Sequence, residues 1–187
     1  MLHSAVSTIR AFLDLTAAED TILETLADQV EQLAENYCGR KLATASRTVY
    51  LDGNAEEYLF LPEPAESILA PRVDSGRDFE SGDALDSDEY ALEDDGVRVR
   101  RLDSTWTQGD RNIRIICTVG FATIPDDLLL MENMEVGRWY QRMKEAQTGD
   151  INLDAQTIRG WAMTFSKREG LSDESKDTLK YYKVASL

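Results

Sequence analysis

Few side chains in this sequence have the types and spacing that catalysis requires. His3 is the one histidine, and no second base or metal ligand stands near it. Cys38 and Cys117 lack the paired spacing of a zinc site and lie among apolar neighbours, which predicts two buried free thiols. There is also no glycine-rich phosphate loop and no HExxH pattern. We therefore expect no catalytic residues, no metal and no cofactor.

Carboxylate chemistry is the one reaction class that the composition leaves open. The chain has 35 Asp and Glu residues, so that many pairs have a suitable spacing and none stands out. Asp83, Asp86 and Asp88 resemble the start of a calcium loop, but the glycine at the sixth position and the glutamate at the twelfth are missing. A carboxylate-dependent hydrolase is therefore kept as an alternative function, ranked third after the two hypotheses described below.

The negative charge is concentrated in the first half of the chain. The formal net charge is -15, and residues 1–97 contain 22 acidic and 6 basic side chains. Such a protein repels nucleic acid unless it has a local basic patch, because phosphate binding depends on Lys and Arg. The one basic cluster, residues 97–101, has the pattern of a strand, and we expect a solvated or ion-paired face there.

Helices are predicted near both ends of the sequence. Apolar spacing predicts helices at residues 4–13 and 17–38, the second preceded by a capping box from Thr16 to Glu19. A further helix at residues 126–147 begins after Pro125, and shorter helical segments are expected near residues 154–165 and 172–182. The long helix 17–38 has an acidic face that is either a solvated surface or the lining of a channel; its candidate residues are Glu24, Asp28, Glu31 and Glu35.

The middle of the chain has the period of two that is typical of strands. Residues 48–51 and 58–61 flank Asp52-Gly53-Asn54, which predicts a hairpin. Further strands are expected at residues 67–73, 90–92, 97–101 and 113–119, with a turn at Asp94-Asp95-Gly96. The run from Asp74 to Glu89 lacks apolar periodicity and is predicted to be a mobile acidic loop.

These elements predict an α+β fold, a small helical bundle with an inserted antiparallel β-region. We expect a core at residues 1–150, with helices 4–13, 17–38 and 126–147 and a β-rich insert at 47–119. Residues 151–187 would then form a C-terminal helical extension for contacts with other subunits. The sequence has no run of about 20 apolar residues and no signal-peptide pattern at its start, so we expect a protein made in the cytoplasm.

Several short motifs follow one another in a characteristic order over roughly residues 1–148. They are Asp20 to Leu42 with Gly39-Arg40-Lys41, Tyr50-Leu51-Asp52-Gly53, Leu59-Phe60-Leu61-Pro62-Glu63-Pro64, Thr118-Val119-Gly120-Phe121-Ala122-Thr123-Ile124-Pro125-Asp126-Asp127-Leu128, Trp139-Tyr140 and Arg142. With these motifs and this order of elements, the sequence resembles the head-tail connector or adaptor family of tailed phages, the head completion proteins, which also occur in gene-transfer particles.

The resemblance implies a structural, non-enzymatic protein of the virion neck. Its members form a ring, usually of twelve copies, under the portal vertex, with a stopper or completion protein on the tail side. Genome DNA passes through the lumen without specific binding, and the four acidic residues of helix 17–38 would line that channel. A further expectation is a portal or subunit interface in the C-terminal segment, at Lys176, Leu179, Lys180, Tyr181, Tyr182 and Lys183.

A rival hypothesis is an acidic DNA mimic or inhibitor. It requires carboxylates that are spaced like phosphates on a rigid surface. The densest acidic run, Asp74 to Asp95, is predicted to be flexible, which favours the adaptor over the mimic.

Overall fold

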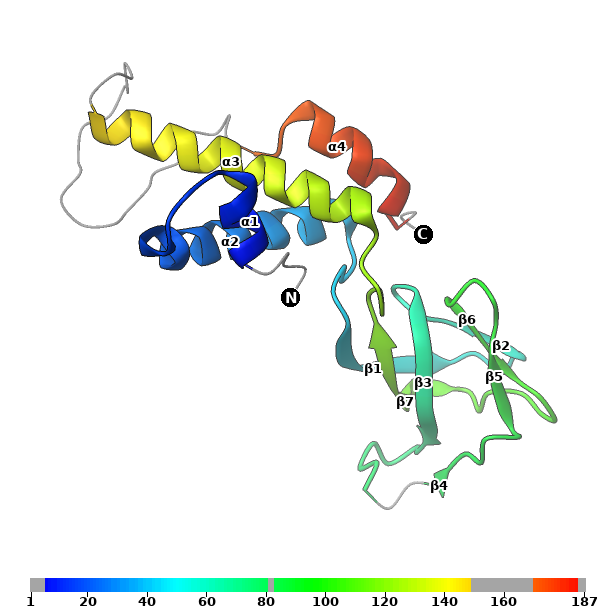
Figure 1. Ribbon diagram of the computed structural model, residues 1–187. Coiled ribbons are helices and arrows are strands. Elements are labelled where there is room, and N and C mark those ends of the chain that lie inside the picture. The colour runs from blue at the N-terminus through cyan, green and yellow to red at the C-terminus, as the bar shows by residue number, and fades with distance from the viewer. Residues whose placement is uncertain (1–5, 81–82, 149–169, 185–187) are drawn as a thin grey trace. The chain divides into compact units, whose positions relative to one another are not determined.

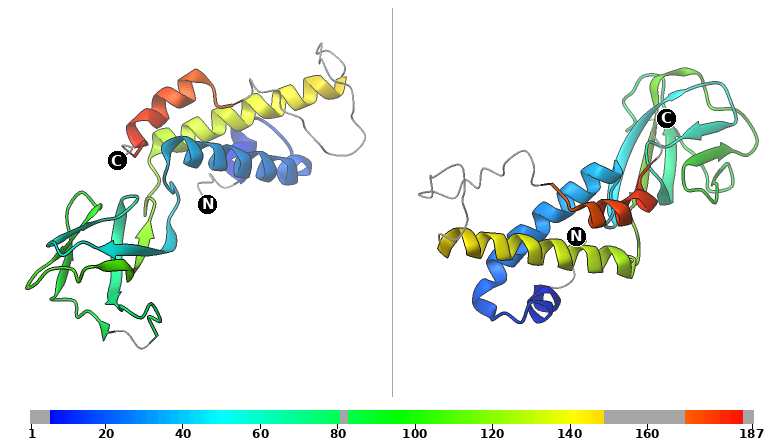
Figure 2. Two further views of the ribbon diagram at one scale, coloured as in Figure 1. Left: turned by 180° about the vertical axis from the view of Figure 1, so that it is seen from behind. Right: turned by 90° about the horizontal axis from the view of Figure 1, so that it is seen from above.

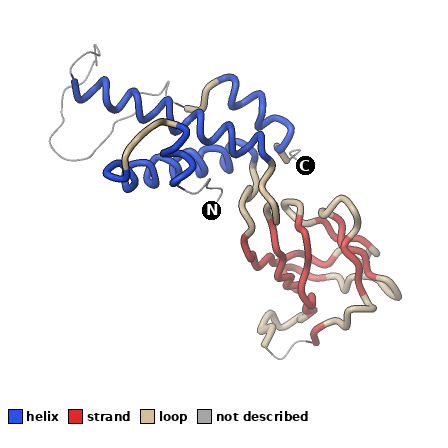
Figure 3. The backbone as a smooth tube through the Cα atoms, in the orientation of Figure 1, coloured by secondary structure: helices blue, strands red, loops and turns tan. Residues whose placement is uncertain are grey.

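The computed structural model describes residues 6–80, 83–148 and 170–184 of the chain (Figure 1). The chain divides into a helical unit, Met1–Cys38 with Ile124–Ala185, and a β unit, Gly39–Thr123. The described helices belong to the first unit and the described strands to the second (Figure 3). The expectation of an α+β fold with an inserted antiparallel β-region is confirmed. The helix expected near residues 154–165 lies outside the described residues.

The helical unit is built around two long helices, α2 and α3, which contact each other along their apolar faces. The shorter α1 and α4 also pack against α3 (Figure 2). Its core includes Leu26 and Val30 of α2 and Leu128, Val136 and Trp139 of α3. The elements are α1 (Val6–Phe12), the 3-10 turn η1 (Ala17–Glu19), α2 (Asp20–Cys38), α3 (Asp126–Thr148), α4 (Asp173–Leu179) and the 3-10 turn η2 (Lys180–Tyr182).

The start of α2 differs from the predicted capping box. The Thr16 hydroxyl donates to the Glu19 carboxylate at 3.0 Å and does not cap a backbone amide. Because η1 occupies residues 17–19, the α-helix begins only at Asp20. The helix ends as expected, with Gly39 in the left-handed conformation at φ +70°.

The β unit consists of two small antiparallel sheets that share one core. The four-stranded sheet has the order β1-β7-β3-β4, and the three-stranded sheet has the order β2-β6-β5. Trp106, Leu59, Val99, Ile113 and Ile115 form the centre of the core. The strands are β1 (Ala45–Gly53), β2 (Tyr58–Phe60), β3 (Ala65–Val73), β4 (Asp83–Ala84), β5 (Tyr90–Leu92), β6 (Arg98–Arg101) and β7 (Gly109–Val119).

The predicted hairpin between residues 48–51 and 58–61 is wrong, although both segments contain strands. β1 pairs with β7, and β2 pairs with β6 in the other sheet. Residues 54–58, which connect β1 to β2, are held by local hydrogen bonds: the Asn54 side chain accepts from the Glu56 backbone N–H and donates to the Tyr58 carbonyl. Ala55 N–H also donates to Trp106 O at 3.0 Å, which directs the chain from one sheet to the other.

The acidic run after β3 begins with residues folded around the Asp74 carboxylate and includes the short strand β4, so it is not irregular throughout as expected, while its mobility stays a prediction. The Asp74 carboxylate accepts the backbone N–H groups of Gly76, Asp78 and Phe79. The Phe79 ring is buried and lies 5.4 Å from the Tyr50 ring, centroid to centroid. These hydrogen bonds from backbone N–H groups lower the pKa of Asp74, and the largest contributions come from Phe79 and then Gly76.

Candidate interaction surfaces

The acidic residues expected to line a channel lie on the sequence-predicted helix α2. Glu24 and Asp28 are exposed, and Glu31 and Glu35 are half-buried. Their spacing of four, three and four residues places them along one side of the helix. The neighbouring side of α2 contributes Leu23, Leu26, Ala27, Val30 and Ala34 to the core, which is why Glu31 and Glu35 are half-buried. The acidic face is thus fixed in orientation by a buried apolar face of the same helix.

The predicted C-terminal interface residues divide into buried and exposed groups. Leu179 is fully buried, and its carbonyl accepts the Cys38 thiol at an Sγ–O distance of 3.7 Å. Tyr182 bonds to Asp127 of its own chain. Tyr181 is 88% exposed. The structure therefore leaves Tyr181, together with the lysines around it, as the accessible part of this segment.

The three lysines of this segment each have a partner within the chain. Lys176 pairs with Asp173 at 3.1 Å, and Lys180 pairs with Asp177. The Lys183 ammonium lies 5.4 Å from the centroid of the Tyr37 ring. An open surface hollow of about 550 Å³ lies beside Tyr181, lined also by Asp177, Thr178 and Lys180. The exposed face of α4 and η2 is therefore mixed in charge, with a tyrosine at its centre.

A buried glutamate that sequence reasoning missed holds the segment 170–184, here called the C-terminal arm, against α3. Glu135 is 1% exposed, and it accepts Ser172 N–H at 2.8 Å and the Ser175 hydroxyl at 2.6 Å. Arg138 donates to the same carboxylate and to the Gly170 carbonyl. Burial alone would raise the pKa of Glu135, but the bonds from Ser172, Ser175 and Arg138 outweigh it and lower the pKa. The signal in the sequence was an acidic residue on the apolar side of a predicted helix.

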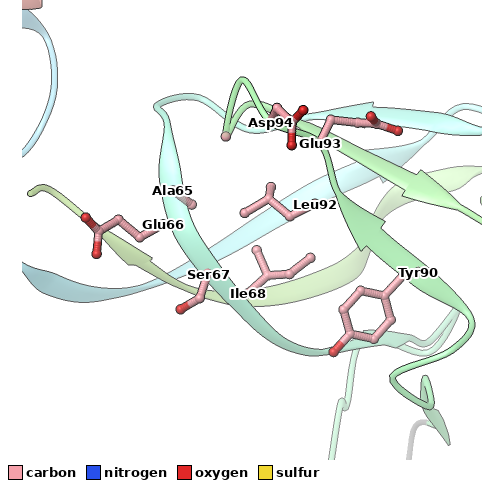
Figure 4. A pocket seen from close by; sticks show the side chains of 9 residues that line it. Ala65, Glu66, Ser67, Ile68, Tyr90, Leu92, Glu93 and Asp94 are labelled. Atoms are coloured by element: carbon pink, nitrogen blue, oxygen red, sulfur yellow. The ribbon is translucent and has the colours of Figure 1, made fainter. Parts of the chain in front are cut away.

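The β unit has a surface groove between β3 and β5 (Figure 4). Ile68, Tyr90 and Leu92 provide apolar side chains, while Glu93 and Asp94 lie at one end. Its volume is about 700 Å³, and none of its nine lining residues is basic. Glu66 points away from Glu93 and Asp94, and its carboxylate accepts Ala122 N–H at 2.8 Å. The groove is thus a potential binding surface with an apolar floor and an acidic end.

Two expectations from the sequence concern metal binding and the two cysteine thiols. The described residues contain no group of three or more His, Cys, Asp or Glu side chains placed to hold a metal ion. Both cysteines are free and buried, as predicted, and burial, followed by the nearby Glu63 carboxylate, raises the pKa of the Cys117 thiol. No helix among the described residues is long and apolar enough to cross a membrane.

The charged side chains of the β unit mostly bond within the unit. Arg98, Arg100 and Arg101 pair with Asp95, Glu57 and Glu89, which confirms the expected ion-paired face. The Asp95 carboxylate also accepts the amides of Arg98 and Val97, and these bonds lower its pKa to about 2. Carboxylates that close turns in this way are not displayed as a row of phosphate substitutes, which weighs against a DNA mimic.

The described surface therefore presents an acidic helix face, an anchored C-terminal arm and a groove between the two sheets. A family model for the head completion protein matches residues 4–185. The chain therefore belongs to the head completion protein family and is a structural head-tail adaptor. No curated protein matches the sequence.

Solved structures of gene transfer agent (GTA) particles share this fold. A chain in the neck of an empty GTA particle, computed with C6 symmetry, has a TM-score of 0.65 and 17% identity, and the match covers 98% of this chain and 91% of that chain. A chain in the virion of a native GTA particle has the same TM-score and 18% identity, with the same coverage. A chain in the native GTA neck, computed with C12 symmetry, has a TM-score of 0.61 and 18% identity, covering 97% and 89%.

Proposed function

We propose that this protein forms a homo-oligomeric ring of twelve copies under the portal vertex of a tailed phage or phage-like particle. The ring extends the DNA channel and links the portal to a stopper or completion protein on the tail side. The observation that carries the proposal is the family match over residues 4–185. The likeness of the fold to chains in GTA necks supports it. The role is structural and involves no turnover.

The acidic face of α2 lines the channel in this proposal. DNA that moves through a lumen must not adhere to the wall, and a wall of carboxylates repels phosphate. Glu24, Asp28, Glu31 and Glu35 supply such a wall, because the helix core fixes them on one side. The DNA therefore passes without specific binding.

The C-terminal arm supplies the contact with the portal. Exposed tyrosines are frequent anchors of protein interfaces, because they combine a large apolar ring with a polar tip. Among the large hydrophobic side chains of the described residues, Tyr181 is the most exposed. Lys176, Lys180 and Lys183 lie close to it in the sequence. The contribution of Leu179 and Tyr182 is indirect, because they hold the arm in place.

Light scattering after size exclusion tests this function directly. The purified protein is measured alone and with a portal ring from the same particle. Co-elution as one species, with an added mass that corresponds to twelve copies, is the expected result. A monomer that elutes separately from the portal at every mixing ratio would contradict the adaptor function.

A further inference from the structure

Among the described residues, the four-stranded sheet of the β unit has one unpaired edge, at β1, and a second edge, at β3, that β4 pairs only in part. β1 is the outermost strand on one side, and β7 occupies only one of its edges. On the other side, β4 pairs with β3 only at Arg72 and Val73. Leu85 N–H bonds to the Pro71 carbonyl and Ala65 N–H bonds to the Gly96 carbonyl, which closes the two ends of that edge. Residues 66–70 therefore have no strand partner on this side among the described residues.

Unpaired strand edges present backbone N–H and C=O groups that readily pair with another chain. Natural proteins usually cover such edges or interrupt them with charge; β1 carries the exposed charges Arg47 and Asp52, and between and beside them it exposes Ser46, Thr48 and Tyr50. The edge of β3 carries Leu69, which is 63% exposed. Each edge thus has hydrogen-bonding capacity and an exposed apolar side chain, since Tyr50 is 43% exposed.

The register of the sheet places these exposed residues on one face. Thr48 pairs with Ile116 of β7, and Ile116 pairs with Leu69 of β3, so the three residues form one row. Side chains of directly paired residues lie on the same face of a sheet. Tyr50 lies two residues from Thr48 and shares that face. If β1 of a second copy lay beside β3, its Thr48 and Tyr50 would cover Leu69.

The opposite face of the same edge shows charge complementarity. Arg47 pairs with Cys117, and Cys117 pairs with Ile68, which lines the groove between β3 and β5. A second β1 beside β3 would therefore direct its Arg47 toward the groove, whose end contains Glu93 and Asp94. The Arg47 side chain is 54% exposed even while it pairs with Glu63 of its own chain. Val49 and Leu51, on the same face as Arg47, stay packed against the core of their own β unit, so Arg47 is the residue of this face that reaches the neighbouring copy.

We infer that β1 of one copy pairs with the open edge of β3 in the next copy, so that the four-stranded sheets join head to tail around the ring. Both strands are antiparallel to β7, so they run parallel to each other within one copy. A neighbour related by a small rotation presents its β1 in that same direction. The contact uses two different surfaces and is heterologous, which is the type of interface that closes a ring. This inference rests on the proposed ring.

Cysteine cross-linking between two variants tests the contact. Thr48→Cys and Leu69→Cys place exposed thiols at the two edges, and the native Cys38 and Cys117 are buried. The variants are mixed, assembled with the portal ring and treated with a short bismaleimide. We expect a linked dimer in the mixture and its loss when either variant is used alone. Thr48→Cys mixed with Phe60→Cys is the matched control, because Phe60 is also exposed (52%, against 63% for Leu69) but lies on β2 of the other sheet.

A charge variant tests the role of the groove. Replacing Glu93 and Asp94 by Lys repels Arg47, so the link between Thr48→Cys and Leu69→Cys should be lost. Asp103→Lys, which reverses an exposed acid elsewhere in the β unit, should leave the link unchanged. A link that survives the Glu93 and Asp94 replacements would remove the groove from the contact.

The mass of the assembly separates this inference from the proposed function. If a portal-bound ring forms and the link appears when the two variants are mixed but not with either alone, both the adaptor function and the edge pairing are supported. A portal-bound ring without the link overturns the edge pairing and leaves the adaptor function in place. A link without portal binding supports the edge pairing and contradicts the adaptor function. If neither is observed, both are overturned.

Discussion

The hydroxyl of Tyr182 lies 2.7 and 2.8 Å from the two carboxylate oxygens of Asp127. These residues are 55 positions apart, and the bond joins the end of the C-terminal arm to the first turn of α3. Val184 N–H bonds to the Cys38 carbonyl at 2.9 Å and adds a connection to α2. With Glu135 at the other end, the arm is held against the helical unit along its whole described length.

Removal of the Tyr182 hydroxyl should loosen the end of the arm. Tyr182→Phe removes one hydrogen bond to a charged partner that keeps access to water, so we expect a loss of about 1 kcal/mol in local stability. Hydrogen exchange of the amides of residues 180–184 should accelerate about fivefold, which corresponds to that energy. Tyr181→Phe is the control, because the Tyr181 side chain is almost fully exposed. Equal exchange rates in the two variants would contradict the role of the bond.

The same bond predicts a loss of stability in alkaline solution. Burial, followed by the hydrogen bond and charge of Asp127, raises the pKa of Tyr182 to about 12 from its ordinary value of 10.0. The folded protein therefore keeps the phenolic proton at pH values where the unfolded chain loses it. The stabilising contribution is complete below pH 10 and disappears as the pH rises toward 12. Tyrosinate absorbance, compared between wild type and Tyr182→Phe, should show one tyrosine that titrates late.

Acid should release the other end of the arm. The pKa of Glu135 is lowered from its ordinary value of 4.5, because bonds from Ser172, Ser175 and Arg138 outweigh its burial. Its contribution is present above pH 4.5 and disappears as the pH falls through the lowered pKa of the folded state. Glu135→Gln should remove this acid dependence and destabilise the protein by roughly 1–3 kcal/mol, because a buried polar group loses part of its bonding.

Chemical denaturation at several pH values, with hydrogen exchange of residues 170–176, measures this effect. Glu174→Gln is the matched control, since Glu174 lies in the first turn of α4 but is exposed. The role of Glu135 would be refuted if both variants retained the same dependence of unfolding on pH between about 3 and 5, a window that extends mainly below the ordinary pKa of 4.5 because the folded pKa is lowered.

Local sequence patterns were sufficient to predict the long helices and one turn. Strand pairing and the docking of the C-terminal arm depend on contacts between residues far apart in the sequence, and these could not be predicted. The apolar spacing of α2 and α3 and the turn at Gly96 depend on neighbouring residues, so one sequence suffices to find them. The pairing of β1 depends on β7, about 65 residues away, and no local signal distinguishes it from a hairpin with β2. The same holds for the arm: Ser172 was recognisable as a helix start, but its partner Glu135 was not.

The site residues follow the same rule. The acidic face of α2 follows from helical periodicity, whereas the burial of Leu179 depends on its packing against the helical unit near Cys38. Lys180 and Tyr181 are exposed because they lie on the side of η2 that does not face Cys38 and the helical unit. The groove between β3 and β5 was not predictable, because its walls come from two sheets whose pairing the sequence did not reveal.

Two glycines with similar backbone conformations should differ greatly in their tolerance of alanine. Gly39 and Gly120 have φ values of +70° and +83°. A Cβ at Gly39 meets no atom within 4 Å, so Gly39→Ala should cost only the conformational strain, about 1–2 kcal/mol. A Cβ at Gly120 would lie 2.1 Å from the Ala43 carbonyl oxygen, which is part of the backbone and cannot rotate away. Gly120→Ala should therefore unfold the β unit, and thermal melts of the two variants measure the difference. Equal melting temperatures would show that the chain can separate Gly120 from Ala43 at little cost.

Portal attachment should depend on the exposed part of the arm and not on its buried anchors. Tyr181→Ala removes an exposed ring without disturbing a described hydrogen bond, so the melting temperature should stay unchanged while attachment to the portal weakens. Replacing Lys176 and Lys180 together by Glu should also weaken attachment. That variant additionally places like charges beside Asp173 and Asp177, which costs a few tenths of a kcal/mol per pair in α4. Co-elution with the portal ring, measured beside the melting temperature, separates the two effects. A Tyr181→Ala protein that binds the portal as well as wild type would remove the arm from the portal interface, whereas weaker binding at an unchanged melting temperature would place Tyr181 in it.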